Sequence, residues 1–263
     1  MTNIVLSFDD GRADNIEIVR DILVPNKIPA TFNITTGYVD GSCPVKMLPS
    51  EKPALTIEEV KEIGSNPLFE IALHGNNHLN SIDDIFAGKE KLIEWLRLPT
   101  NSIFGLASPD SGLSPEMFKS DLYKKLRDSI EYMRVSFRIV SFKWYRVLCR
   151  KAARVLHLPM LYKVAYKETL MDSFDEQLLF SVPVMRDITI NEVKALVNYA
   201  IKTQKSLILM FHSIKEDVSQ EDNWTWSTEK FSSLCRYLAQ NRNENNINIC
   251  TSLELIGCLS NSD

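Results

Sequence analysis

Short apolar runs alternate with amphipathic segments along most of the chain. An apolar run bounded by turn residues predicts a buried strand, and apolar residues three or four apart predict one face of a helix. On this basis we expect strands at 3–8, 29–36, 69–73, 102–106, 206–211 and 247–251. We expect helices at 14–23, 56–64, 82–96, 119–133, 189–203 and 227–241. Two of these helices begin with a capping box, Thr56 to Glu59 and Thr189 to Glu192.

The alternation of strands and helices predicts parallel strands joined by right-handed crossovers, hence a wound sheet or a barrel. The positions of four polar residues add to this prediction. Asp9, Asp10, His74 and His212 each follow the carboxyl end of an apolar run. This is the end of an α/β barrel at which catalytic groups lie.

The composition is that of one globular domain spanning residues 1–263, with 44% hydrophobic and 24% charged residues. The net charge of −4 gives no reason to expect nucleic acid as a partner. Because the first apolar run starts at Ile4, no space is left for a signal peptide, and we expect a cytoplasmic protein. The five cysteines form no C-x-x-C pair, which favours reduced thiols.

Three of the four histidines follow predicted strands. His74 and His78 are four residues apart, so that a turn or a first helical turn can direct both imidazoles to one point. This spacing is typical of metal ligands. Taken alone, any one of His74, His78 and His212 is better explained as a hydrogen-bonded structural histidine.

Asp9 and Asp10 are adjacent carboxylates after a buried strand. Like charges at this spacing repel unless a cation or a proton is shared between them, and a metal ion would resolve the conflict. The alternative is that Asp-Asp-Gly is a turn that starts the helix at residue 14.

These motifs resemble those of the polysaccharide deacetylase family (NodB homology domain, carbohydrate esterase family 4). Residues 7–11, Ser-Phe-Asp-Asp-Gly, are similar to the T-F-D-D-G motif of the family. Residues 74–78 are similar to H-(S/T)-x-x-H, and residues 210–212 to L-x-H. The segment 29–34 also resembles an A-T-F-F-V strand. The resemblance implies a distorted (β/α)7-type barrel, NodB/polysaccharide deacetylase-like.

The resemblance also implies a role for each residue. Asp10, His74 and His78 would bind one divalent metal ion, with Asp9 as general base and His212 as general acid. Zinc is the default metal, and cobalt, nickel, manganese or iron would suit the same ligands. Two imidazoles and one carboxylate leave open positions on such an ion, which lowers the pKa of bound water.

Two parts of the family pattern differ in this chain. An arginine of the family, which orients the base, is missing from residues 107–112, Ala-Ser-Pro-Asp-Ser-Gly. Either Arg134 substitutes from the next strand or Asp9 is positioned differently, and we name Asp110 and Arg134 as candidate substrate-binding residues. Asp110 could instead belong to a turn. Asp172 or Asp175 is the candidate carboxylate that orients His212.

A basic segment covers 119–167, with thirteen Lys and Arg against three Asp and Glu. We expect a basic helical insertion there. Cationic and apolar residues at helical spacing within 137–166 could make peripheral contact with an anionic membrane surface or bind an anionic substrate. A solvated basic face over a packed apolar one is the alternative. Trp224 could stack on a sugar ring or pack in the core.

Together these features predict a metal-dependent hydrolase that removes N-acetyl groups from amino sugars of a saccharide or a polysaccharide precursor. Hydrolysis of a small non-sugar amide is one alternative, because it needs the same chemistry. A catalytically degenerate barrel that binds saccharide is the other, and the missing arginine is the argument for it.

Overall fold

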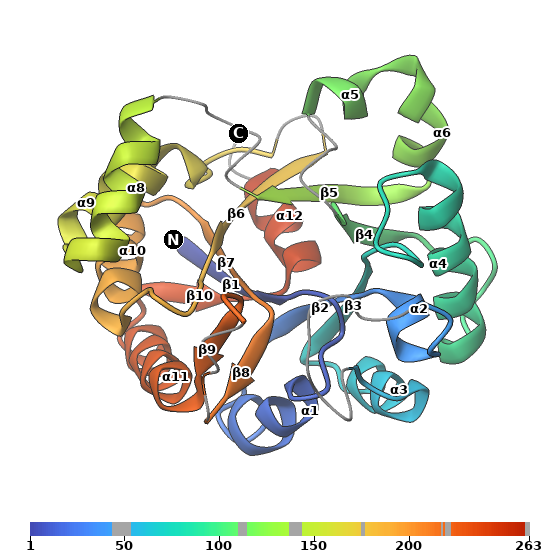
Figure 1. The fold of residues 1–263 in the computed structure, drawn as a ribbon, viewed down its shortest axis with the longest axis horizontal. Coiled ribbons are helices and arrows are strands. Elements are labelled where there is room, and N and C mark those ends of the chain that lie inside the picture. Colours follow the sequence, from blue (N-terminus) through green and yellow to red (C-terminus); the bar gives the residue numbers. More distant parts are fainter. Residues whose placement is uncertain are drawn as a thin grey trace.

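The computed structural model describes residues 1–43, 54–109, 115–136, 144–174, 177–216, 218 and 222–260. Seven parallel strands form a ring that closes between the first and the seventh (Figure 1). They are β1 (Thr2–Phe8), β2 (Ala30–Ile34), β3 (Phe69–Leu73), β4 (Phe104–Ala107), β5 (Ile130–Ser136), β6 (Leu178–Pro183) and β7 (Leu207–Phe211). The predicted (β/α)7-type barrel is confirmed.

Strand β1 is shared among three neighbours. Its residues Ile4 to Phe8 pair with Leu207 to Phe211 of β7, which closes the ring. Its first residues, Thr2 to Ile4, pair with β10 (Ile247–Ile249), and its last two pair with β2. Two short strands outside the ring, β8 (Ser213–Lys215) and β9 (Thr225–Ser227), pair with each other.

The helices other than α12 lie around the ring, and short helical turns join several of them (Figure 1). None of the helices in the described residues is long and apolar enough to cross a membrane. The helical segments are α1 (Asn15–Ile18), η1 (Val19–Leu23), α2 (Thr36–Val39), α3 (Ile57–Ser65), α4 (Ile82–Leu96), α5 (Pro115–Lys119), η2 (Asp121–Tyr123), α6 (Lys124–Arg127), α8 (Trp144–Leu156), α9 (Pro159–Tyr166), η3 (Lys167–Thr169), α10 (Ile190–Thr203), α11 (Thr228–Asn243) and α12 (Ser252–Ser260).

Two apolar clusters hold the fold together. The larger one packs outward-facing strand residues against the surrounding helices. The smaller one joins Val5, Leu179 and Ile208 to Leu255 and Leu259 of α12. Because side chains alternate along a strand, these three strand residues share the interior face of the ring. Helix α12 therefore packs its apolar side against the interior of the barrel.

The segment 119–133, which we predicted as one helix, does not form a single helix in the structure. Short helices end at Arg127, and residues 130–136 form β5, so this part of the prediction is wrong. The apolar spacing of Ile130-Glu-Tyr-Met-Arg-Val suits a helix or a strand, and pairing with β4 and β6 decides for the strand. Thus a barrel strand lies inside the stretch 119–167 where we expected an insertion, and α8 and α9 belong to the crossover from β5 to β6.

Candidate metal and catalytic site

Five of the predicted site residues meet at the carboxyl ends of three strands. Asp9 and Asp10 follow β1, His74 and His78 follow β3, and His212 follows β7. Asp9, His74 and His212 continue the inward-facing alternation of their strands, so their side chains lie at the mouth of the barrel. The backbone of Asp9 donates a hydrogen bond to the Phe211 carbonyl at 2.9 Å, which ties the ends of β1 and β7 together.

Asp10, His74 and His78 form a compact cluster. The Nε2 atoms of the two histidines are 3.2 Å apart, and each lies 3.5 Å from Asp10 Oδ1. Tetrahedral ligands at ~2.0–2.1 Å from zinc are separated by about 3.3 Å, so this triangle fits one divalent ion. Within the described residues, these three make up the group of His, Cys, Asp or Glu side chains whose ligand atoms lie close enough together to share one metal ion.

Hydrogen bonds orient the members of this cluster. The Nδ1–H of His74 donates to the Ala107 carbonyl at 3.0 Å, which leaves Nε2 as the free ligand atom. The Nε of Arg12 donates to Asp10 Oδ2 at 2.8 Å and leaves Oδ1 facing the histidines. Burial raises the pKa of Asp10, but a hydrogen bond with His74 and the nearby cationic groups hold it well below its usual value.

His78 is the more exposed of the two histidines in the cluster. Its ring stacks on Tyr38, with centroids 6.0 Å apart. Burial and the neighbouring His74 lower the pKa of His78 to about 4, so its imidazole is neutral at physiological pH. The neutral form is the one that binds a metal.

Asp84, in the first turn of α4, holds the loop that carries both histidines. Its carboxylate accepts hydrogen bonds from the backbone N–H groups of Asn76, Asn77 and Leu79 at 2.9–3.1 Å. Gly75 of this loop has a φ of +76°, and a Cβ there would lie 2.7 Å from the Asp84 carboxylate. The loop therefore requires both the glycine and the aspartate.

Asp9 is buried and paired with Arg134 of β5. The Nη2 of Arg134 donates to both carboxylate oxygens, at 2.6 and 2.7 Å, and Asn33 Nδ2 donates to Oδ1 at 2.8 Å. Burial raises the pKa of Asp9, but Arg134 and then His74 outweigh it, so the pKa lies below its usual value. Arg134 thus makes the contact with Asp9 that its candidacy as a substitute for the missing arginine requires. It is itself buried against Asp9 and Ser181, which argues against direct substrate contact.

His212 lies under Trp224, whose ring centroid is 4.4 Å from that of the imidazole. Burial lowers the pKa of His212, opposed by the charges of Asp10 and Asp9. The buried Nδ1 has no hydrogen-bond partner within the described residues. Asp172, one of the two carboxylates predicted to orient His212, is exposed and pairs with Lys205 at 2.6 Å instead. Trp226, by contrast with Trp224, is a core residue.

Two predicted residues, Asp110 and Asp175, lie outside the described residues. The sequence analysis missed two residues that contact the site, Arg12 and Asp84. Arg12 follows the Asp-Asp-Gly motif directly, yet nothing in its spacing indicates that its side chain turns back to Asp10. Its Nη1 also lies 3.6 Å from Asp222 Oδ2, far along the chain. Asp84 had one signal, because Ser81 caps α4 and places Asp84 in the first turn.

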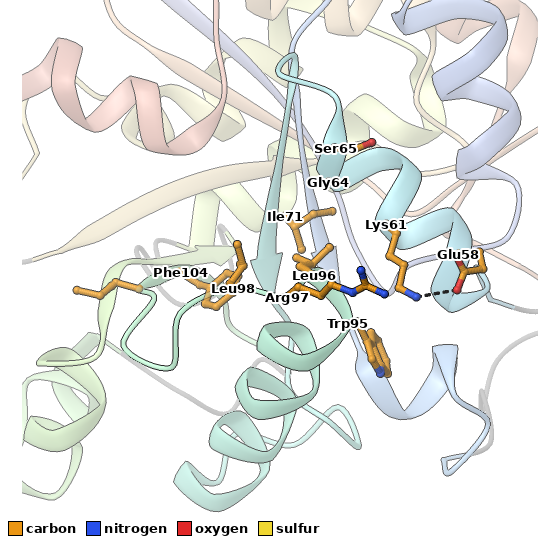
Figure 2. Close-up of a pocket in the computed structure, with 11 residues that line it drawn as sticks. Glu58, Lys61, Gly64, Ser65, Ile71, Trp95, Leu96, Arg97, Leu98 and Phe104 are labelled. Atoms are coloured by element: carbon orange, nitrogen blue, oxygen red, sulfur yellow. Dashed lines mark hydrogen bonds and ion pairs between the residues drawn. The ribbon is translucent and has the colours of Figure 1, made fainter.

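A separate cavity of about 570 Å³ lies between one side of α3, the carboxyl end of α4 and the start of β4 (Figure 2). It is lined by Trp95, Arg97 and Phe104 among others, and its Lys61 is paired with Glu58 at 2.7 Å. It contains none of the residues of the metal and catalytic site.

Comparison with known proteins gives a family match. A family model described as polysaccharide deacetylase matches residues 2–146, more than half of the chain. No curated protein matches the sequence. A Mycobacterium smegmatis structure assigned to the polysaccharide deacetylases is 12% identical, with a TM-score of 0.50, over 98% of this chain and 90% of its own. That likeness concerns the fold.

Two further structures are more distant in shape. Polysaccharide deacetylase Bc1974 from Bacillus cereus is 8% identical over 95% of this chain and 92% of its own, with a TM-score of 0.46. Deacetylase PplD from Streptococcus pyogenes, solved in complex with acetate, is 23% identical, with a TM-score of 0.34, over 43% of this chain. The match covers only 48% of the PplD chain, about half of that relative's length.

Proposed function

The chain belongs to the polysaccharide deacetylase family, and from this premise we propose that it is a metal-dependent hydrolase that removes N-acetyl groups from amino sugars of a saccharide or its precursor. The observation that carries the proposal is the cluster of Asp10, His74 and His78, whose ligand atoms lie 3.2–3.5 Å apart beside Asp9 and His212. A metal site with one carboxylate and two imidazoles, next to a separate acid and base, suits the hydrolysis of an amide.

Asp10, His74 and His78 would hold the divalent ion. When bound, such an ion supplies a Lewis acid that lowers the pKa of water and polarises the acyl carbonyl. The ligand atoms are prepared for this role, because the hydrogen bond to Ala107 fixes the tautomer of His74 and Arg12 fixes the rotamer of Asp10. Several first-row divalent ions accept this set of oxygen and nitrogen ligands. Coordination geometry and metal supply therefore decide which ion binds.

Asp9 is the proposed general base. The Arg134 guanidinium lowers its pKa, so the carboxylate is ionised at neutral pH and able to accept a proton. Its Oδ1 already accepts two hydrogen bonds, from Arg134 and Asn33, whereas Oδ2 accepts the one from Arg134. We therefore assign proton transfer from the attacking water to Oδ2.

His212 is the proposed general acid, which protonates the departing amine. Amide nitrogen is a poor leaving group unless it is protonated, so this step is needed for C–N cleavage. The carboxylates of Asp9 and Asp10 favour the cationic imidazole and oppose the effect of burial. Trp224 covers the ring and limits its contact with solvent.

The test is acetate release from N-acetylglucosamine oligosaccharides by the purified protein, with its metal content measured in parallel. We expect activity in the metal-loaded protein and its loss in Asp9→Asn and His74→Ala. His157→Ala is the matched control, because the fourth histidine is exposed and pairs with Glu192 away from the cluster. Acetate release from small non-sugar amides alone, or sugar binding with bound metal and no turnover, would contradict the proposal.

A further inference from the structure

The hairpin of α8 and α9 exposes an unusual amount of apolar surface. Of the sixteen large hydrophobic side chains that are exposed in the described residues, eight lie within 144–164, so the exposure is concentrated rather than scattered. They are Trp144, Tyr145, Leu148, Val155, Leu156, Leu158, Met160 and Val164. Figure 1 places both helices at the left margin of the molecule.

Helix α8 points its apolar side at solvent. Trp144, Leu148 and Val155, spaced by four and seven residues, lie on one side of the helix and are 74%, 58% and 77% exposed. The opposite side, with Arg146 and Ala153, is buried. A surface helix ordinarily buries its apolar side, so α8 has the orientation of a helix whose apolar side is covered by something else.

The charge of the hairpin indicates what covers it. Residues 144–167 contain six Lys and Arg and no Asp or Glu. Lys151 lies on the same exposed side of α8 as Leu148 and Val155. A helix with apolar and aromatic residues on one side and basic residues along its margins is typical of segments that lie in the interface of an anionic membrane.

The hairpin is attached to the mouth of the barrel. Arg154 of α8 pairs with Asp187 at 2.9 Å, in the loop that follows the carboxyl end of β6. The next residue back in that loop, Arg186, donates its backbone N–H to the Asn223 carbonyl, beside Trp224. A surface that contacts the hairpin therefore lies close to the rim of the catalytic site.

We propose that the α8–α9 hairpin docks the protein on the surface of a membrane that contains anionic lipids. Apolar side chains of α8 enter the interface, and the exposed Lys151 contacts the lipid head groups. The helices lie along the membrane and do not cross it. The docking is independent of the hydrolytic reaction proposed above.

The test is flotation of the full chain with vesicles of phosphatidylcholine containing phosphatidylglycerol, beside vesicles of phosphatidylcholine alone. We expect binding to the anionic vesicles and a blue shift of tryptophan emission that Trp144→Phe removes. Val155→Glu is expected to weaken binding by about tenfold or more, because it puts a charge where the proposal has an apolar side chain entering the membrane interface. Lys151→Glu should weaken it as well and reduce its dependence on salt, because one attraction that salt screens is lost.

Leu122→Glu is the matched control, because Leu122 is 72% exposed and lies outside the hairpin. Its binding should equal that of the unmodified protein. Absence of binding to the anionic vesicles, or an equal loss in Leu122→Glu and Val155→Glu, would overturn the proposal. A dimer that Val155→Glu converts to a monomer, with no vesicle binding, would also overturn it and assign this face to a second copy of the chain.

Discussion

At the scale of single residues, Asp9 and Arg134 show how the barrel supplies a missing partner from a neighbouring position. Arg134 lies two residues before the end of β5, yet its Nη2 reaches both oxygens of Asp9 across the ring. Comparison with the family motif located the missing arginine and offered Arg134 as one of two explanations, but it could not decide between them, because the contact joins strands that are not neighbours in the sheet.

Arg134→Gln should raise the pKa of Asp9, since it removes the cation that lowers it against burial. The pH profile of kcat/KM is then expected to lose activity on its acidic side at a higher pH than in the unmodified enzyme. A depressed carboxylate pKa stabilises the fold above the unfolded pKa, and this stability is lost as pH falls through the folded pKa. The pH–rate profile and denaturation at several pH values measure the two effects.

The same substitution breaks a buried ion pair and should cost about 3–5 kcal/mol of unfolding free energy. Arg134→Lys keeps the charge but not the bidentate contact, so its acidic limb should shift less. Arg20→Gln, at an exposed pair with Glu62, is the control and should change neither quantity measurably. An unshifted acidic limb in a folded Arg134→Gln protein would exclude Arg134 as the group that tunes the base.

At the scale of elements, the loop 74–79 depends on one carboxylate of the following helix. Asp84 accepts hydrogen bonds from three backbone N–H groups of this loop, and Gly88 of α4 lets the helix approach it, since a Cβ there would be 2.9 Å from the Gly75 backbone. The positions of His74 and His78 are thus set from outside the motif that contains them.

Asp84→Ala is expected to lower metal affinity by about 10- to 100-fold, because the histidines lose the loop that orients them. Isothermal titration of the metal-free protein with zinc measures this directly. Asp83→Ala is the matched control, since Asp83 is exposed in the same first turn. Equal affinity in Asp84→Ala and Asp83→Ala would show that the loop holds its shape without the carboxylate.

Sequence patterns located most of the barrel strands because buried strands are short, apolar and bounded by turns. The same patterns predicted that Asp9, Asp10, His74 and His212 lie at one end of the barrel, since each follows a strand. They missed β6, whose run Leu178 to Pro183 ends in a proline, and they extended a helix into β5. The stacking of Trp224 on His212 and the Arg12 contact with Asp10 depend on loop paths, which local patterns do not determine.

At the scale of the whole molecule, α12 stabilises the barrel from within. Leu255 packs with Val5 and Ile208 of the interior, while Glu70 of β3 accepts a hydrogen bond from the backbone N–H of Leu253 in the first turn of the helix. A carboxylate at a helix N-terminus is favourable, and here it connects the ring to the helix that fills it.

Leu255→Ala should lower the free energy of unfolding by about 2–5 kcal/mol, because the interior of the ring cannot close around the cavity it leaves. Urea denaturation followed by circular dichroism gives the value. Leu253→Ala, on the exposed side of the same helix, should change it by less than about 0.5 kcal/mol. Similar losses in the two variants would mean that α12 matters through its helical structure and not through its contact with the interior.

The pairing of β1 with β7 has a further consequence for biogenesis. The proposed base and acid belong to the first and the seventh strand and become neighbours only where these strands meet. A partly folded chain can form the loop that carries His74 and His78 while Asp9 and His212 are still apart. The proposed reaction therefore requires that β1 and β7 have paired, and recovery of turnover during refolding would time that pairing.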